Sequence, residues 1–377
     1  MRVGVDARVL VHQPTGVARY LSGILAELPA DRFAGLSLFV DRRPPVGSAL
    51  ANGGPLKHLA DAVEIARWPL PGGDPAWRQL RLPASLVWRE LDVLLCPFYS
   101  VPLATGVPRV VTVHDVSFAV HPEWYSMRAR AAFSFARRSA RAASRVLTVS
   151  RFSKNEIVRE LEVEPGKIDV VPPGIDPRWL EPVSRRERDR ARDWLELEGR
   201  FLLHLGAVHR RRNVDLAFEA LASIARHHPD LSLVVAGPGY ESIRTPPASG
   251  LPIVRRPWAP EEHLRGLIAE ASAMMYLSSY EGFGLPALEA LAVGTPVVAL
   301  RRASLPEVLG DAACWVDDAE PGAVAEATSG LLSLLAEPGR AESWSTHGMK
   351  RARKFDRYES MERTWRVLAE AAAGKRR

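Results

Sequence analysis

The chain has 377 residues, of which 47% are hydrophobic and 25% charged, and this suits a globular protein of about two domains. No apolar run approaches the roughly 20 residues that a membrane-spanning helix needs. The two cysteines, Cys96 and Cys314, lie far apart without metal-ligand spacing, which argues against a disulfide framework and favours a cytoplasmic protein. The formal net charge of +6 suits phosphate groups, anionic lipids or nucleic acid, without choosing among them.

The first half of the chain alternates short apolar runs with helical stretches. An amphipathic helix is expected from about Val17 to Leu28, after a turn around Pro14. Apolar, β-branched runs separated by helices indicate a parallel sheet covered on both faces. The strands expected here are Val3–Val5, Leu36–Val40, Leu91–Leu95, Arg109–His114, Val146–Val149 and Ile168–Val171.

A second α/β series starts near Phe201, after a proline- and charge-rich stretch at Pro172–Arg200 that we interpret as a linker leading into a helix. Helices are expected at Val214–His227 and Glu261–Ala271. The fold class is therefore α/β, with two doubly wound Rossmann-like domains at 1–175 and 176–356 facing across a cleft. The expected strands are Phe201–Leu205, Leu231–Ala236, Ile253–Arg255, Ala273–Leu277 and Pro296–Leu300.

The segment Ser278–Ala290 combines a glycine-punctuated loop, a helix start near Pro286 and two glutamates, Glu281 and Glu289. A helix N-terminus exposes backbone N–H groups that favour a bound anion, and glycines let a ligand approach the backbone. Two carboxylates beside such a site could hold hydroxyl groups, so a nucleotide-sugar fits the segment. An ordinary strand–turn–helix joint with glutamates facing solvent is the alternative.

A run of arginines, Arg210–Arg212, directly follows the expected strand that ends near Leu205. Guanidinium groups at a strand end could clamp a diphosphate, because they are planar and permanently charged. Arg211 and Arg212 are the expected phosphate contacts. A solvated basic loop explains the same residues equally well.

Two segments of the first domain also follow strands. His114 and Asp115 end a strongly apolar strand, where Asp115 could orient the imidazole ring or cap the next segment. Gly16, in the segment Gln13–Val17, would let a backbone N–H face a diphosphate at a helix N-terminus. For His114, the alternative is a structural histidine whose hydrogen bonds are made at the strand end. For Gly16, the alternative is an ordinary strand–helix turn.

The stretch Met127–Val146 is expected to be one helix that carries arginines and no acid. At 100° per residue, most of these arginines fall on one side of the helix, with aromatic residues nearby. Such a stripe suits an anionic membrane surface, although a plain solvated face explains it too. The arginines are Arg128, Arg130, Arg137, Arg138, Arg141 and Arg145.

Together these segments resemble the family 4 retaining glycosyltransferases, which have the GT-B fold. The resemblance covers essentially the whole chain and rests on motifs in family order. Within the family, the motifs are most similar to those of bacterial polysaccharide mannosyltransferases. The motifs are GVDAR, PTGVARY, VPRVVTVHDVSFAVHPEWY, VLTVSRFSKNEI, VVPPGIDP, LHLGAVHRRRNVDLAFEAL, SSYEGFGLPALEALAVGTPVVAL and SLPEVLGDAA.

The resemblance implies a role for each matching position. Glu281 would contact the donor sugar, Glu289 the ribose hydroxyls, and His114 would lie close to the reacting sugar. The implied catalytic residues are Glu281, His114, Arg211 and Arg212. The implied donor-binding residues are Gly16, Gly206, Arg211, Arg212, Gly282, Phe283, Gly284, Leu285 and Glu289.

The chain departs from the family at two positions. Arg212 stands where the family usually has a phosphate-binding lysine, and Ala207 stands where many members have arginine. Arg211 could supply the charge missing at Ala207, but an arginine differs from a lysine in shape. A final helix, 357–377, is expected to cross back to the first domain, as in other GT-B proteins.

The expected reaction transfers a hexose, with mannose favoured, from a nucleotide-diphosphate sugar such as GDP-mannose to a hydroxyl, with retention and without metal or other cofactor. No D-x-D-like sequence is present. The acceptor would be a saccharide or a lipid-linked saccharide at the inner face of the cell membrane. The acceptor side would include Phe98, Tyr99, His121 and Trp124.

Three alternatives stay open. Another GT-B enzyme, such as a nucleotide-sugar epimerase or a sugar phosphorylase, would share the same donor site. A non-catalytic nucleotide-sugar-binding protein would keep the site without turnover. A nucleic-acid-binding protein is disfavoured, because the sequence has no recognition-helix motif, zinc spacing or aromatic RNA-binding signature.

Overall fold

The computed structural model describes residues 1–12, 16–51, 54–66, 76–239, 250–257 and 259–374. The contacts within the chain divide it into two compact units. Unit 1 comprises Met1–Gly174 and Asp356–Arg377, and unit 2 comprises Ile175–Phe355. Each division falls one residue before the boundary expected from the sequence.

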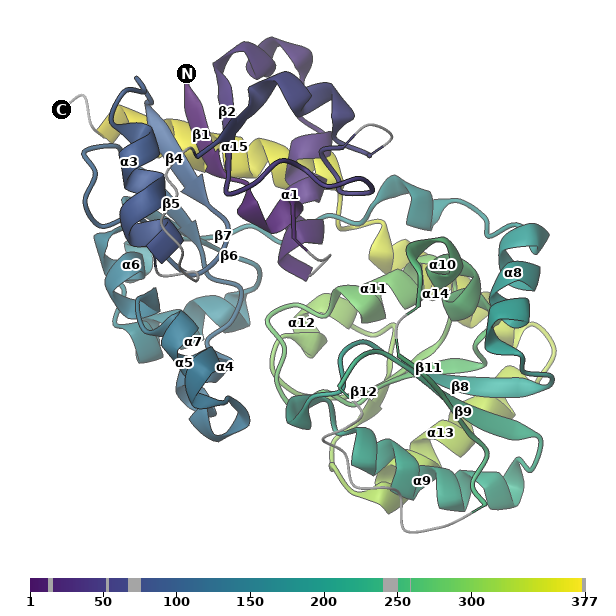
Figure 1. Ribbon diagram of the computed structural model, residues 1–377. Coiled ribbons are helices and arrows are strands. Elements are labelled where there is room, and N and C mark those ends of the chain that lie inside the picture. The colour runs from purple at the N-terminus through teal and green to yellow at the C-terminus, as the bar shows by residue number, and fades with distance from the viewer. Residues whose placement is uncertain (13–15, 52–53, 67–75, 240–249, 258, 375–377) are drawn as a thin grey trace. The chain divides into compact units, whose positions relative to one another are not determined.

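Unit 1 is built on a seven-stranded parallel sheet with the strand order β3-β2-β1-β4-β5-β6-β7 (Figure 1). Each apolar run that was predicted to be a strand in this half forms one. The short strand β3 was not predicted. Every strand except β3 buries apolar side chains, as a sheet covered by helices requires. The strands are β1 (Val3–Asp6), β2 (Leu36–Val40), β3 (Val63–Ile65), β4 (Val93–Cys96), β5 (Arg109–Thr112), β6 (Arg145–Thr148) and β7 (Ile168–Val170).

Helices cover both faces of this sheet. Leu82 and Leu86 of α3, Ala140 of α6 and Ile157 of α7 share one apolar core with the strands. The helices are α1 (Gly16–Ala26), α3 (Leu82–Leu86), α4 (Ser117–Val120), α5 (Met127–Phe133), α6 (Ala136–Ala142), α7 (Arg151–Leu161) and α15 (Arg357–Ala373), with short 3-10 helices at Arg8–Leu10, Ala30–Gly35, Lys57–Ala62, Pro122–Trp124 and Pro165–Lys167 and a π-helix at Trp77–Arg81.

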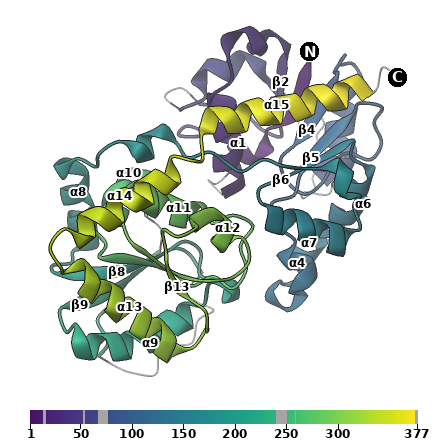
Figure 2. The ribbon, with the colours of Figure 1, turned by 180° about the vertical axis from the view of Figure 1, so that it is seen from behind.

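The C-terminal helix α15 belongs to unit 1 and lies beside α1 and across β4 and β5 (Figure 2). Its buried face includes Met361, Val367 and Leu368. Two arginines fasten it: Arg357 Nε donates to the Gly23 carbonyl at 3.1 Å, and Arg363 Nη2 donates to the Val170 carbonyl at 2.7 Å. The C-terminal helix α15 therefore packs on the same sheet that contains the N-terminal strand β1.

The prediction of one arginine-striped helix at Met127–Val146 is wrong. The stretch forms α5 and α6, separated at Ser134 and Phe135, and Arg145 opens strand β6. Arg145 pairs with Val110 in the sheet and donates to both Asp169 oxygens, at 2.6 and 2.8 Å. Strand pairing therefore overrides the helical pattern read from the sequence.

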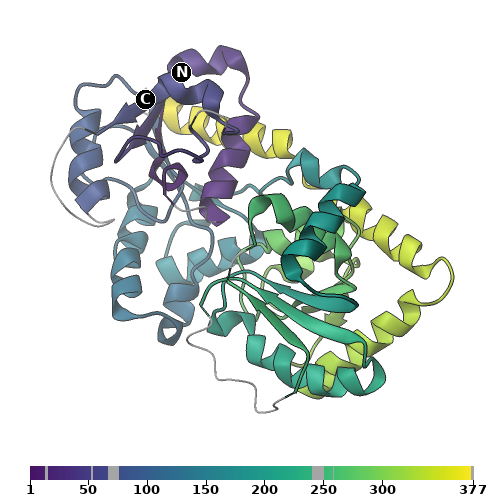
Figure 3. The ribbon, with the colours of Figure 1, turned by 45° about the vertical axis from the view of Figure 1, so that its right-hand side comes forward.

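Unit 2 has a six-stranded parallel sheet with the strand order β10-β9-β8-β11-β12-β13, drawn in teal and green in Figure 3. All the strands predicted for this half form, and the short strand β13 was not predicted. The strands are β8 (Arg200–Leu205), β9 (Leu231–Ala236), β10 (Ile253–Arg256), β11 (Ala273–Tyr276), β12 (Val297–Leu300) and β13 (Cys314–Val316).

The helices of unit 2 lie on both faces of its sheet, with α9 and α13 on one face and α10, α11 and α14 on the other (Figure 1). The helix expected at the end of the proline- and charge-rich linker is α8, which starts with a capping box of Ser184 and Glu187. The helices are α8 (Arg185–Leu195), α9 (Val214–His227), α10 (Glu261–Glu270), α11 (Leu285–Ala292), α12 (Leu305–Leu309), α13 (Pro321–Leu335) and α14 (Arg340–Ala352), with single turns at Pro177–Leu180 and Arg210–Arg212. No described helix is long and apolar enough to cross a membrane.

The core of unit 2 contains a histidine without a hydrogen-bond partner. His204 of β8 is 3% exposed and lies opposite Val235 of β9. Neither of its ring nitrogens finds a partner within the described part of the chain. Burial, followed by the charge of Arg212, lowers the pKa of His204 from 6.5 to about 3. His204 is therefore neutral in the folded protein, whereas it can take up a proton in the unfolded chain.

We predict that His204→Leu reduces the acid sensitivity of unit 2. A lowered pKa in the folded state contributes instability that grows as the pH falls from about 6.5 toward 3, because only the unfolded chain binds the proton. This histidine alone costs the parent on the order of 1 kcal/mol at pH 5.5 relative to pH 7.5. Urea unfolding of parent and variant at both pH values measures the difference.

Val235→Ala is the control, because it removes core volume from the same strand pair without changing a titratable group. Its loss of unfolding free energy should be equal at the two pH values. An unchanged pH dependence in His204→Leu would contradict the prediction.

Candidate functional site

The candidate site of unit 2 lies where β8 and β11 end, at the carboxyl edge of the sheet. The turn η8 (Arg210–Arg212) follows β8 and is tied to the loop after β11. Asn213 Nδ2 donates to the Leu277 carbonyl and to Ser279 Oγ, both at 2.7 Å. The Ser279 amide in turn donates to the Arg211 carbonyl at 2.8 Å. These bonds fix the arginine turn against the loop that carries Glu281.

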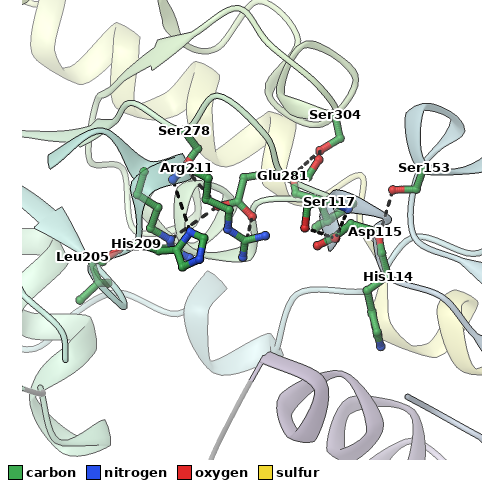
Figure 4. Close-up of polar contacts among 12 residues, drawn as sticks. His114, Asp115, Ser117, Ser153, Leu205, His209, Arg211, Ser278, Glu281 and Ser304 are labelled. Atoms are coloured by element: carbon green, nitrogen blue, oxygen red, sulfur yellow. Dashed lines mark hydrogen bonds and ion pairs between the residues drawn. The ribbon is translucent and has the colours of Figure 1, made fainter. Parts of the chain in front are cut away.

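Glu281 lies at the centre of this arrangement and is 6% exposed. Ser278 Oγ donates to Glu281 Oε1 at 3.1 Å, and Figure 4 shows Glu281 beside Ser278 and Arg211. Arg212 Nε lies 3.6 Å from Oε1, and Arg211 Nη2 lies 3.9 Å from Oε2. The structure thus brings two of the predicted catalytic residues, Arg211 and Arg212, close to the buried carboxylate of the third, Glu281.

The guanidinium of Arg212 is held on three sides. Its Nη1 donates to the Leu205 carbonyl at 2.8 Å, and its central carbon lies 5.7 Å from the ring centroid of Tyr276. Gly206, with φ +110°, completes the enclosure, because a Cβ there would lie 2.1 Å from Arg212 Nη1. Gly206 is therefore needed for the position of Arg212, a close-approach role that its sequence position alone did not specify.

The loop from Glu281 to Gly284 ends at the start of α11. Gly284 adopts φ +100° as the N-cap, and a Cβ there would lie 2.8 Å from Leu305 Cδ2. Ser304 Oγ donates to the carbonyls of Glu281 and Phe283, at 2.8 and 3.2 Å. The N-terminal backbone of α11 thus starts from a rigid loop.

The remaining donor-binding predictions lie in or beside this loop. Gly282, Phe283 and Leu285 flank Gly284, and Glu289 lies buried on α11. The Phe283 ring packs edge-on against Phe355 with the centroids 5.4 Å apart. Both predicted glutamates are therefore buried, and the alternative of glutamates facing solvent is wrong.

A cavity of about 360 Å³ lies beside the same arginine turn. It does not include Glu281, Arg211 or Arg212 among the residues that line it. Its lining consists of Val208, His209, Arg210, Asn213, Val214, Asp215, Leu216, Ser279 and Ala319.

In unit 1, His114 follows β5 and its Nε2 donates to the Pro97 carbonyl at 2.9 Å. The ring packs edge-on against Tyr20 and Tyr99, with centroid distances of 4.9 and 5.9 Å. Burial lowers the pKa of His114, which outweighs the hydrogen bond to Pro97 and the charge of Asp115. The imidazole is therefore neutral near pH 7, with Nδ1 as an acceptor.

Asp115, for which two roles stayed open, caps the next segment. Its Oδ1 accepts from the Ser117 amide at 2.9 Å and from Ser117 Oγ at 2.6 Å. Ser153 Oγ donates to the His114 carbonyl at 3.0 Å, and Figure 4 shows these contacts together. The loop around His114 is thus held by serines from α4 and α7.

The residues predicted for the acceptor side form two separate groups. Tyr99, with φ +52°, lies among Phe98, Phe118 and Phe133, with ring centroids 4.9 to 5.7 Å away. His121 and Trp124 stack on each other at 3.8 Å. Within this predicted set, Tyr99 has a ring contact with His114.

Gly16 is the first described residue of α1 and is exposed, with open space where a Cβ would be. The preceding residues of its predicted loop, 13–15, lie outside the described residues. Among those that are described, no group of three or more His, Cys, Asp or Glu side chains could hold a metal ion.

Sequence reasoning missed several residues of the unit 2 site. Tyr276, Ser278, Asn213 and Ser304 all position the predicted residues, as the contacts above show. Ser278 was inside the predicted segment, and Asn213 directly follows the predicted arginine run. The sequence did not indicate a functional role for Tyr276, because it ends an apolar strand and is typical of a core residue.

Two protein-family models match the chain, one in each half. The family described as Glycosyltransferase Family 4 matches residues 14–179, and the family described as Glycosyl transferases group 1 matches residues 199–334.

Curated relatives match the chain at about 30% identity. The MMP alpha-(1->4)-mannosyltransferase of Mycolicibacterium hassiacum is 32% identical over 272 residues, covering 68% of this chain and 63% of that protein. The O-antigen chain mannosyltransferase B of Escherichia coli is 30% identical over 267 residues, covering 65% of this chain and 66% of that protein. The match thus spans just under two thirds of each relative.

Solved structures share the fold over the whole chain. Anabaena HepE, in complex with UDP-glucose, has a TM-score of 0.71 and 18% identity, covering 98% of this chain and 99% of that one. WaaG, a glycosyltransferase involved in lipopolysaccharide biosynthesis, has a TM-score of 0.69 and 15% identity, covering 98% and 99%. The predicted GT-B fold is thereby confirmed. With its two matching family models and its mannosyltransferase relatives, the chain belongs to the family 4, group 1 glycosyltransferases.

Proposed function

We propose that this protein transfers a hexose from a nucleotide-diphosphate sugar to a hydroxyl acceptor, with retention at the anomeric carbon. The observation that carries the proposal is the buried carboxylate of Glu281, set between Arg211 and Arg212 beside the N-terminus of α11. The mannosyltransferase names of two relatives favour mannose as the sugar and GDP-mannose as the donor.

The two arginines would stabilise the charge that the reaction creates. When the glycosidic bond to the diphosphate breaks, negative charge develops on the β-phosphate. Arg211 and Arg212 supply permanent positive charge, and the backbone N–H groups at the start of α11 supply further donors. Preorganised groups of this kind can lower a barrier by several kcal/mol.

Glu281 would hold the sugar and Glu289 the ribose hydroxyls. In this proposal Glu281 forms no covalent bond to the sugar, and the departing phosphate takes the proton of the acceptor hydroxyl on the same face. A carboxylate that accepts from Ser278 and faces two guanidiniums is oriented by three partners. His114 would contribute its neutral Nδ1 as an acceptor for a sugar hydroxyl, because Nε2 is used by Pro97.

We predict that Glu281→Gln and Arg212→Ala each lower kcat/KM for transfer by at least about 100-fold, since each removes a preorganised charge from the site. Transfer is measured with a panel of nucleotide-sugars, including GDP-mannose, and the products are identified by mass. Arg226→Ala, an exposed arginine on α9, is the charge-matched control and should keep parental activity.

Near-normal transfer of every donor by both site variants would refute the assignment. A product without a new glycosidic bond would instead indicate an epimerase, and sugar phosphate formation a phosphorylase. Binding of a nucleotide-sugar without any turnover would indicate a non-catalytic binding protein.

We also propose that the reaction needs no metal, because the arginines neutralise the diphosphate. Transfer by the purified protein should then be unchanged in excess chelator. Rate measurements with and without chelator, followed by re-addition of divalent cations, test this. Loss of activity that a metal restores would rule the proposal out.

The acceptor is proposed to be a saccharide or a lipid-linked saccharide reached from the inner face of the cell membrane. A further relative, from Mycobacterium tuberculosis, is a GDP-mannose-dependent phosphatidylinositol dimannoside mannosyltransferase with 33% identity over 165 residues, covering 43% of each chain. The exposed Met127, Arg130 and Arg138 support a membrane contact on α5 and α6.

The other arginines of this stretch support that membrane contact less. Arg137 and Arg141 form ion pairs with Glu162, and Arg145 is used in the sheet. The side chain of Arg128 lies outside the described part of the chain.

We predict that the protein floats with anionic vesicles and not with neutral ones, and that Arg130→Glu together with Arg138→Glu abolishes flotation. Reversed charge at two exposed positions repels an anionic surface. Arg226→Glu is the control on the other unit. Equal flotation with neutral and anionic vesicles would contradict the membrane proposal.

A further inference from the structure

Tyr276 lies directly beneath the arginine turn of unit 2. It is the last residue of β11 and is 2% exposed. Its ring faces the guanidinium of Arg212, whose central carbon is 5.7 Å from the ring centroid. A guanidinium over an aromatic face is held by the ring quadrupole, so the ring helps to fix Arg212.

The hydroxyl of Tyr276 lies close to the loop that carries Glu281 and Gly284. A Cβ placed on Gly284 would lie 3.9 Å from this hydroxyl oxygen. Burial raises the pKa of Tyr276 well above its ordinary value, and the next cause is the charge of Glu281, opposed by Arg212 and Arg211. The phenol is therefore protonated, and it lies within the field of all three charged residues of the site.

This hydroxyl makes no well-formed hydrogen bond within the described part of the chain, although its weak hydrogen-bonding interaction with Glu281 adds to the rise in the pKa of Tyr276. A buried hydroxyl without a partner costs about 1–3 kcal/mol, a cost that a phenylalanine at the same place would not carry. A tyrosine that served packing alone would thus be a poor choice. The cost is explained if the weak interaction with Glu281 becomes a well-formed hydrogen bond in another state of the site.

The arrangement of Glu281 indicates which partner that is. Glu281 Oε1 accepts from Ser278 Oγ at 3.1 Å, while Arg212 and Arg211 lie 3.6 and 3.9 Å from its oxygens. A diphosphate carries more negative charge than one carboxylate, so it competes with Glu281 for the charge and the donors of both guanidiniums. Glu281 is then less well neutralised and can accept a stronger hydrogen bond from the neighbouring Tyr276 hydroxyl.

We propose that Tyr276 is a positioning residue: its hydroxyl donates to Glu281 when a nucleoside diphosphate engages Arg211 and Arg212, and its ring keeps Arg212 in place. This inference rests on the proposed donor site. The hydroxyl acts on the orientation of the sugar through Glu281, whereas the ring acts on the diphosphate through Arg212. The two functions of one side chain can therefore be separated by substitution.

Tyr276→Phe removes only the hydroxyl. We expect an unchanged or higher unfolding temperature, affinities for UDP and GDP within twofold of the parent, and a kcat at least about 10-fold lower. Tyr276→Leu also removes the ring, and should weaken binding of the nucleoside diphosphate as well. Met274→Leu, a volume-conserving change at a buried position of the same strand, is the control and should match the parent in all three measurements.

A spectroscopic measurement tests the hydrogen bond without turnover. In protein labelled with ¹³C at the hydroxyl-bearing carbon of tyrosine, the Tyr276 resonance is assigned by its loss in Tyr276→Phe. Addition of UDP or GDP should shift this resonance in the parent, and the shift should be absent in Glu281→Ala.

The outcomes separate the two proposals. Parental kcat in Tyr276→Phe, a lowered unfolding temperature with parental kcat, or a resonance that nucleotide does not move would each overturn the role of Tyr276. If the parent transfers no sugar but the resonance shifts on nucleotide addition, the proposed function fails and the hydrogen bond stands.

Discussion

The site of unit 2 depends on one electrostatic constraint: a buried carboxylate must be matched by positive charge and by hydrogen-bond donors. An isolated ionised carboxylate in a protein interior costs several kcal/mol, so Glu281 requires its surroundings to be ordered. Arg211 and Arg212 supply the charge, and Ser278 supplies a donor. The tightly constrained glycine at 206 follows from the same requirement, because only a residue without Cβ leaves room for the guanidinium of Arg212.

The same arrangement suits a site that must exchange one anion for another. The distances of 3.6 and 3.9 Å between the guanidiniums and Glu281 are too long for well-formed hydrogen bonds. Arg212 is therefore held in place by another contact, the hydrogen bond to the Leu205 carbonyl, and not by Glu281. Its charge is thus positioned before a ligand binds, which is what preorganisation requires.

The sequence predicted the parts of the fold that local patterns determine. Alternating apolar runs predicted both sheets, and the glycine–glutamate segment together with the arginine run predicted which side chains meet at the edge of the second sheet. The features that were not predicted depend on contacts between residues far apart in the sequence. The helical stripe through Arg145 was wrong because pairing with Val110 places that arginine in a strand. Tyr276 and His204 were missed because their strands are apolar, and only the three-dimensional structure shows what faces them.

The position of α15 has a consequence for how the protein is made. The sheet of unit 1 is encoded by Met1–Gly174, but the helix that covers β4 and β5 is encoded by Arg357–Ala373. At about 5–20 residues per second, a ribosome needs roughly 10 to 40 s to pass from Gly174 to Ala373. During that interval the apolar surface that Met361, Val367 and Leu368 will cover stays open to solvent. Unit 2 can therefore fold first, although it is encoded second, and chaperones have a defined period in which to act on the N-terminal sheet.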